Sequence, residues 1–254
     1  MSYGICTLSI APCRAEGSDR AELVTQLLFG EVYRVIEEDE KWVKIITDLD
    51  SYECWICRKQ FTEISVKQFE EYKLHKPPLC ADLIGEIANS KGESSTITIG
   101  TTLPFYGKNI FKIQDEKYTF KGAINSKNKS DVVEYSLLYL NAPYLWGGRT
   151  PFGIDCSGFS QIVYSLCGHQ ISRDAYQQAE EGINVEFVEL TEPGDLAFFD
   201  NEEGKITHVG IVTEPGKIIH ASGKVRIDSL DQQGIFNKEL GKYTHKLRVI
   251  KRIL

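Results

Sequence analysis

The 254-residue sequence has no excess of basic charge, no long apolar run and only five histidines. A net charge of −7 and a pI near 5.4 provide no general attraction to nucleic acid or to an anionic membrane. No stretch approaches the roughly 18 apolar residues of a membrane-spanning helix. We therefore expect neither nucleic acid nor a membrane as a partner.

The first residues, MSYGICTLSIAPCRAEGSDR, lack the basic segment and following apolar segment of a secretory signal. The seven cysteines cannot all pair, and they lack the spacings of a secreted disulfide framework, which favours reduced thiols. Both observations predict a cytoplasmic protein. A periplasmic or extracellular one is expected instead if a signal peptide has been trimmed from this sequence.

Residues 1–125 read as two β-rich units. Short strand-like segments divided by turns over 1–64 predict a small barrel or sandwich. A helical connector over 65–79 ends at two consecutive prolines, and a second β unit follows over 80–125. The similar lengths of the two units suggest a duplicated module.

From residue 126 the pattern changes to helices followed by strands. Residues 131–142 have apolar positions at helical spacing behind a Ser130 or Asp131 cap, and helices are expected over 155–168 and 172–182. Strands dominate from 194 to the end. Helices first and an antiparallel sheet afterwards predict an α+β domain over 126–254.

Cys156 stands at the predicted start of the 155–168 helix. Free N–H groups and the positive end of the helix dipole would favour its thiolate and would later stabilise a tetrahedral oxyanion. Gly158 is expected to leave the first turn open to a substrate backbone. A buried core cysteine has the same local pattern, so this stretch alone leaves both interpretations open.

His208 and His220 interrupt two consecutive apolar strands, ITHVGIV and KIIHAS. One such histidine is more often structural, but two of them together with Cys156 favour a Cys–His–His triad. His208 would be the general base and acid, and His220 would fix its tautomer.

The triad imposes a condition on the hairpin between these strands. Side chains alternate along a strand, so a strict two-residue turn at Pro215-Gly216 would place His208 and His220 on opposite faces. The triad therefore predicts an odd-length turn or a bulge near Glu214 to Gly216.

Five motifs occur in a specific order: APYLWGGRTPFGIDCSGFSQIVY, SRDAYQQ, GDLAFF, HVGIV and IHAS. Residues 128–254 thereby resemble the NlpC-type cell-wall cysteine peptidases, a papain-like α+β family. Residues 1–125 are similar to the paired bacterial SH3-like modules of one branch. The resemblance implies a first SH3-like barrel (1–64), a helical linker (65–79), a second SH3-like barrel (80–125) and a papain-like catalytic domain (126–254).

The branch consists of γ-D-glutamyl-L-diamino acid endopeptidases of murein-peptide recycling. It implies an enzyme that cleaves the bond from γ-D-Glu to diaminopimelate or Lys in free murein tri- to pentapeptides, and we expect a monomer without a cofactor. The N-terminal L-Ala of these peptides is unblocked, and the product is L-Ala-D-Glu.

By the resemblance, Cys156 is the nucleophile, His208 the base, His220 the third residue and Tyr144 a tyrosine near the oxyanion. Asp174 matches a carboxylate that holds the free amine of the substrate. Pairing a buried ammonium with a carboxylate makes physical sense, and helix capping is the alternative role for this aspartate.

Further substrate contacts are implied for Ser157 and Asp155. In the first SH3-like module, Glu22 and Tyr52 are candidates for narrowing the cleft near the amine. Ala175 stands where relatives often have serine, which leaves a side-chain hydrogen bond from that position in doubt.

Three other interpretations stay open. Cys54 and Cys57, with Cys6 and Cys13, could form a zinc site, but a strand would turn the first two to opposite faces, so buried thiols and no metal are expected. SH3-like modules could make the protein a non-catalytic wall-binding protein. The papain-like scaffold also hosts amidases and acyltransferases.

Overall fold

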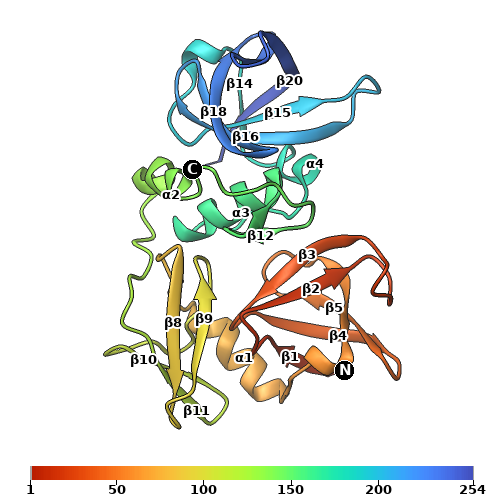
Figure 1. Ribbon diagram of the computed structural model, residues 1–254, viewed down its shortest axis with the longest axis vertical. Helices are drawn as coiled ribbons and strands as arrows, with labels where there is room; N and C mark the ends of the chain where they lie inside the picture. Colours follow the sequence, from red (N-terminus) through yellow and green to blue (C-terminus); the bar gives the residue numbers. More distant parts are fainter. Residues whose placement is uncertain (1, 254) are drawn as a thin grey trace. The chain divides into compact units, whose positions relative to one another are not determined.

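The computed structural model describes residues 2–253 and divides into two compact units, Met1–Asn125 and Ser126–Leu254 (Figure 1). The first unit contains both of the expected β-rich segments, and the second contains the expected helices and sheet. Among the described residues, no helix is long and apolar enough to cross a membrane.

The first unit begins with a seven-stranded antiparallel sheet of order β3-β2-β6-β5-β4-β1-β7. Alternation of buried and less buried residues along β5 and β6 directs one face of each strand into the core. Its elements are β1 (Tyr3–Ile5), β2 (Ile10–Arg14), β3 (Leu23–Leu28), β4 (Val32–Glu38), β5 (Trp42–Thr47), β6 (Glu53–Cys57), η1 (Arg58–Gln60) and β7 (Glu63–Ile64).

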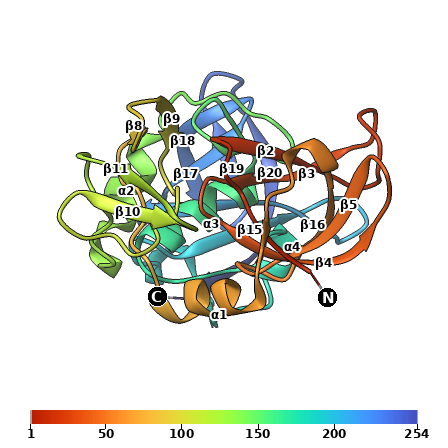
Figure 2. The ribbon, with the colours of Figure 1, turned by 90° about the horizontal axis from the view of Figure 1, so that it is seen from below.

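A helix, α1 (Val66–His75), follows with Ser65 as its N-cap. The second sheet has the order β10-β11-β8-β9 and comprises β8 (Ile84–Asn89), β9 (Ser94–Thr98), β10 (Ile110–Ile113) and β11 (Glu116–Thr119). Figures 1 and 2 show the two strand groups on either side of α1. Phe29, Phe69 and Phe111 belong to one buried cluster, so the two groups and the helix share a core.

The helical part of the second unit contains η2 (Lys129–Asp131), α2 (Val132–Leu138), β12 (Arg149–Thr150), β13 (Gly153–Ile154), α3 (Cys156–Leu166), α4 (Ala175–Gln178) and η3 (Val188–Leu190). Asp131, one of the two predicted caps, is the N-cap residue of α2, but its side chain does not cap the helix. A 3-10 turn precedes α2, Asn128 Oδ1 accepts the Ser130 N–H at 3.2 Å, and Asp131 makes no capping bond. The Asp131 carboxylate instead accepts a hydrogen bond from Ser126.

The sheet of the second unit closes into a barrel. Its order is β14-β20-β15-β16-β17-β18-β19, and β19 also pairs with β20, so six strands form a ring. The strands are β14 (Ile183–Val185), β15 (Leu196–Asp200), β16 (Ile206–Glu214), β17 (Lys217–Ser222), β18 (Lys224–Asp231), β19 (Gly234–Asn237) and β20 (Lys242–Arg252).

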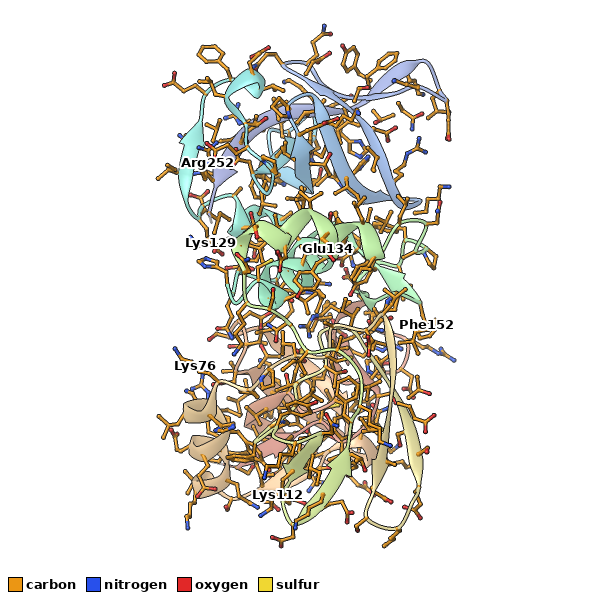
Figure 3. All side chains as sticks on the ribbon, turned by 90° about the vertical axis from the view of Figure 1, so that its left-hand side faces the viewer. Lys76, Lys112, Lys129, Glu134, Phe152 and Arg252 are labelled. Atoms are coloured by element: carbon orange, nitrogen blue, oxygen red, sulfur yellow. The ribbon has the colours of Figure 1, made fainter. Side chains whose placement is uncertain are left out.

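The helix α3 packs against β16 and β17 of this barrel. Arg252, labelled in Figure 3, fastens the end of β20 to the turn before β15 through two hydrogen bonds of 2.9 Å to Asp195. Phe199, Ile218 and Ile235 are part of the apolar cluster inside the ring. The barrel therefore supplies a closed frame on which side chains of several strands can meet.

Candidate active site

Cys156 is the first residue of α3, as predicted. Asp155 is the N-cap, and its Oδ1 accepts the backbone N–H of Gly158 at 2.6 Å. The predicted role of Gly158 is wrong, because a Cβ there would lie 2.4 Å from the carbonyl oxygen of Gly148. The glycine makes room for the chain's own backbone rather than for a substrate.

Cys156 is buried, and its resting charge state differs from the prediction. Burial and the nearby Asp155 carboxylate raise the pKa of Cys156 to about 12. Hydrogen bonds from the backbone N–H groups of Val209 and Ser157 act in the opposite direction but are outweighed. Desolvation therefore overrides the helix terminus, and the resting group is a thiol.

His208 and His220 lie on one face because β16 contains an extra residue. The two-residue turn at Pro215-Gly216 is present, but Thr213 just before it is left unpaired as a β-bulge. Gly210 then pairs with His220, which aligns the alternation of the two strands. The predicted bulge is confirmed, one residue before the predicted position.

That face is the inner face of the barrel. His208 is paired with Phe199 of β15, which belongs to the apolar cluster inside the ring. A second bulge, at Thr207, separates this pair from the end of the β15–β16 ladder. Both histidines are buried, so their hydrogen bonds are made out of water.

The two imidazoles and a carboxylate form a hydrogen-bonded series. His208 Nε2 lies 2.8 Å from His220 Nδ1, and His220 Nε2 lies 3.1 Å from Asp228 Oδ2 of β18. An ionised carboxylate only accepts, so the network assigns Nε2–H to both neutral histidines. The unprotonated Nδ1 of His208 is then left to take a proton.

Asp228 has no role in the sequence-based prediction. Its burial raises its pKa, but hydrogen bonds from His220 and from Arg226 lower that pKa below its ordinary value. Arg226 donates from Nε to Oδ2 at 2.7 Å and from Nη2 to Oδ1 at 3.1 Å. Asp228 lies on the same inward-facing side of β18 as Leu230, a placement that becomes visible only when the barrel is formed.

A buried ion pair fixes the backbone around the cysteine. Arg173, 1% exposed, donates from Nη1 to Asp155 Oδ1 at 3.1 Å and to Ser157 Oγ at 2.9 Å, and from Nη2 to Asp155 Oδ2 at 2.6 Å. Gly147 N–H donates to the same carboxylate at 2.8 Å. Ser157 and Asp155 thus have partners within the chain, and their substrate contacts remain predictions.

Tyr144 lies close enough to the cysteine for their charges to interact. Burial, the Cys156 sulfur and the Asp155 carboxylate raise the pKa of Tyr144 to about 12. The phenol therefore keeps its proton at neutral pH and can donate a hydrogen bond. Its backbone N–H is bonded to the carbonyl of Gly223 at 3.0 Å, which fixes the segment.

Asp174 is half-buried at the N-cap of α4. Its backbone N–H donates to Gln177 Oε1 at 3.2 Å in a capping box, so the capping alternative is present in the structure. Asp174 comes directly after the buried Arg173 in the chain, and its carboxylate interacts with that guanidinium. The role as an amine ligand stays a prediction.

Glu22 and Tyr52 belong to the first unit. Glu22 is exposed directly before β3, and its carbonyl accepts the Ala15 N–H at 3.0 Å. Tyr52 is half-buried, packs against the core of the first sheet, and donates its backbone N–H to Thr47 Oγ1 at 2.9 Å. Their predicted contribution to the cleft remains a prediction.

The cysteines of the first module behave as the strand interpretation predicts. Cys54 is buried and Cys57 is half-buried on the opposite face of β6. Cys6 and Cys13 are buried in the same core as Cys54. Burial raises the pKa of Cys6 to about 12 and that of Cys13 as well, which disfavours the thiolate that zinc requires.

Within residues 2–253, one side-chain cluster is compact enough to hold a metal: His208, His220 and His245, with ligand atoms within 4.8 Å of one another. The His208 and His245 rings are stacked, with centroids 4.2 Å apart and planes 25° from parallel. In-plane lone pairs of stacked rings run side by side, whereas a tetrahedral metal needs converging ones. The arrangement fits proton transfer better than metal binding.

Comparisons with known proteins agree with this geometry. The NlpC/P60 family profile matches residues 141–244, and the bacterial dipeptidyl-peptidase Sh3 domain profile matches residues 13–61. The gamma-D-glutamyl-L-lysine dipeptidyl-peptidase of Bacillus subtilis (strain 168) is 31% identical over 240 residues, covering 85% of this chain and 78% of that relative. The enzyme of the same name from Bacillus cereus (strain ATCC 10987 / NRS 248) is 27% identical over 250 residues, covering 87% and 74%.

The fold agrees as well. The crystal structure of an NlpC/P60 family protein from Bacillus cereus ATCC 10987 matches with a TM-score of 0.81 at 21% identity, over 100% of both chains. The expected α+β fold, a papain-like domain preceded by SH3-like barrels, is confirmed. A cysteine at the start of α3, and a hydrogen-bonded pair of histidines on the two strands that α3 packs against, are groups that cysteine-peptidase chemistry uses. The chain belongs to the NlpC/P60 family and is a cysteine peptidase.

Proposed function

We propose that this peptidase hydrolyses the bond between γ-D-Glu and a diamino acid, diaminopimelate or Lys, in free murein tri- to pentapeptides with an unblocked N-terminal L-Ala, releasing L-Ala-D-Glu. The observation that carries the proposal is the similarity to two proteins named gamma-D-glutamyl-L-lysine dipeptidyl-peptidase. Each similarity covers at least 85% of this chain, so it extends beyond the catalytic domain into residues 1–125.

The catalytic cycle follows from the resting protonation states. As Cys156 Sγ attacks the γ-carbonyl carbon, the thiol proton passes to His208 Nδ1 and the carbonyl electron pair moves onto oxygen. The N–H of Ser157 and the protonated hydroxyl of Tyr144 are the proposed donors to this oxyanion. Collapse breaks the C–N bond, and His208 returns its proton to the leaving amine.

The second half releases the acyl group. Water loses a proton to His208 while its oxygen attacks the thioester carbon, and the departing sulfur recovers that proton as the thiol. The His220–Asp228 bond supports both halves, since it keeps His208 in one tautomer and stabilises the imidazolium that forms.

Asp174 is the proposed ligand for the free amine of L-Ala. Asp174 is half-buried beside the buried Arg173 guanidinium, and an ammonium brought out of water requires a carboxylate partner. A blocked N-terminus would remove that charge and leave the carboxylate unpaired. This would give selectivity for free peptides over murein polymer.

Mass spectrometry of L-Ala-γ-D-Glu-diaminopimelate and of its Lys counterpart tests the proposal. Wild type should release L-Ala-D-Glu and Cys156→Ser should not. Cys167→Ser is a matched control, because Cys167 is a buried thiol at the other end of α3, and it should stay active. Cleavage by Cys156→Ser, or no cleavage by wild type, would overturn the proposal.

A second comparison isolates Asp174. Wild type should cleave the free peptide much faster than its N-acetylated form, and Asp174→Asn should lose most of that preference. Equal turnover of both peptides by wild type would remove the amine-binding role while leaving the peptidase assignment intact.

A further inference from the structure

His245 of β20 lies against the two catalytic histidine candidates. Its ring stacks on His208 at a centroid distance of 4.2 Å and meets His220 edge to face at 5.6 Å. Phe199 closes the same group, 5.8 Å from the His208 ring and 5.9 Å from the His245 ring. The His208 imidazole is thus surrounded by three rings from three different strands.

A backbone irregularity places His245 there. His245 is paired with Ile235, a residue of the barrel core, which puts its side chain on the inner face. Thr244 is left unpaired beside it as a bulge, since Tyr243 already pairs with Phe236. Bulges redirect side chains next to active sites.

Thr244 also orients the ring. Its hydroxyl lies 2.9 Å from His245 Nδ1 and donates to the carbonyl of Ile235 at 3.4 Å. A hydroxyl that donates to a carbonyl can still accept, so this arrangement assigns a proton to Nδ1 of the neutral His245 ring. The ring is therefore held by a bond at one edge and by stacking on its face.

We infer that His245 is a positioning residue that holds the His208 imidazole in the orientation required for proton transfer from and back to Cys156. The inference rests on the proposed role of His208. His245 itself acts through ring-to-ring contact and does not exchange protons with the substrate.

The charges around His245 suit this role. Burial and the nearby His220 lower the pKa of His245 to about 4, although Asp228 acts in the opposite direction. At neutral pH the ring is uncharged and can stack on the imidazolium that forms on His208 without charge repulsion. The titratable and charged groups around the ring are His208 on β16, His220 on β17, Asp228 with Arg226 on β18, and the exposed Lys246 on β20.

Two substitutions at His245 distinguish the contribution of ring stacking from that of the ring nitrogens. His245→Phe keeps an aromatic face, whereas His245→Leu fills similar space without one. We expect His245→Leu to lower kcat roughly 3- to 10-fold with KM unchanged, because this factor corresponds to the loss of one aromatic stack. His245→Phe should retain most of the wild-type kcat. Thermal unfolding of both variants measures any loss of folding separately.

A readout without peptide substrate keeps this test independent of the proposed function. The rate of Cys156 alkylation by iodoacetamide at neutral pH, followed by mass spectrometry, should fall in His245→Leu and recover in His245→Phe. Equal kcat values for Leu and Phe variants, or a loss seen only in KM, would overturn the positioning role. Failure of wild type to cleave the peptide, with the alkylation pattern intact, would instead overturn only the proposed substrate.

Discussion

Asp228 Oδ2 lies 3.1 Å from His220 Nε2, which adds a carboxylate to the hydrogen-bonded pair of His208 and His220. Because both oxygens of Asp228 also accept from Arg226, the carboxylate is held in one orientation. The proton positions on His208 and His220 therefore depend on a residue of β18. This strand pairs with β17, which in turn pairs with β16.

Asp228→Asn should lower kcat by roughly 10²-fold while leaving KM nearly unchanged. The amide NH₂ must face either Arg226, where two donors would meet, or His220, where it would favour the wrong tautomer. Steady-state kinetics on the tripeptide measures both constants. Glu239→Gln is the control, since Glu239 binds the same guanidinium at 3.1 Å but is exposed, and a similar loss there would contradict the relay.

Acid should inactivate the enzyme only well below pH 6.5. Burial and the neighbouring His220 and His245 hold the pKa of His208 well below its usual 6.5, so the neutral base persists on acidification. The pH dependence of kcat/KM on the tripeptide reports this pKa in the free enzyme. An acid limb at or above pH 6.5 would contradict the buried, neutral resting state.

Stability should decline over the same range in which activity persists. The unfolded chain binds a proton at His208 and His245 near pH 6.5, whereas the folded chain binds them at lower pH, so acidification from 6.5 favours unfolding. Urea unfolding between pH 7 and 4 measures the slope. His245→Phe should flatten it, and an unchanged slope would show that His245 is not protonated on unfolding.

Gly210→Ala should disturb the site more than the fold. A Cβ at Gly210 would lie 2.9 Å from the Cβ of His220 and 2.6 Å from Ile218 Cδ1, so the His220 ring must move. We expect kcat to fall by roughly 10-fold or more, because a relay tolerates little displacement. Gly107→Ala, where a Cβ meets nothing within 4 Å, is the control and should keep full activity.

Arg173→Met should lower the free energy of unfolding of the second unit by about 3–5 kcal/mol, because Asp155 is left buried without its partner. Urea unfolding followed by fluorescence gives the value, and any separate transition of the first unit should not move. Lys205→Met removes an exposed pair with Glu203 and should cost less than about 1 kcal/mol. Comparable losses for both would contradict a structural role for the buried pair.

Much of the site could be predicted because its reactive residues interrupt regular apolar patterns or stand at the ends of helices. Cys156 was recognisable at a helix start, and His208 and His220 were recognisable as polar breaks in apolar strands. The bulge followed from side-chain alternation once both histidines were required on one face. These inferences used local periodicity, which a sequence displays directly.

The remaining features depend on packing between distant segments. The resting thiol of Cys156 was missed because the extent of burial is a tertiary property that outweighs the helix terminus. Asp228 and His245 were missed because no local pattern shows that β18 and β20 bring them to the same inner face. Arg173 was part of a recognised motif, but its bond to Asp155 spans 18 positions of the chain.

Three threonines, Thr207, Thr213 and Thr244, occupy the bulges beside the histidines. Each threonine matters mainly as an extra residue in its strand. Deleting it would move the neighbouring histidine side chain from the inner face of the barrel to the outer face. Replacing the side chain at Thr213 leaves the number of residues intact. The active site therefore depends partly on the number of residues in each strand, which a comparison of residue identities alone does not show.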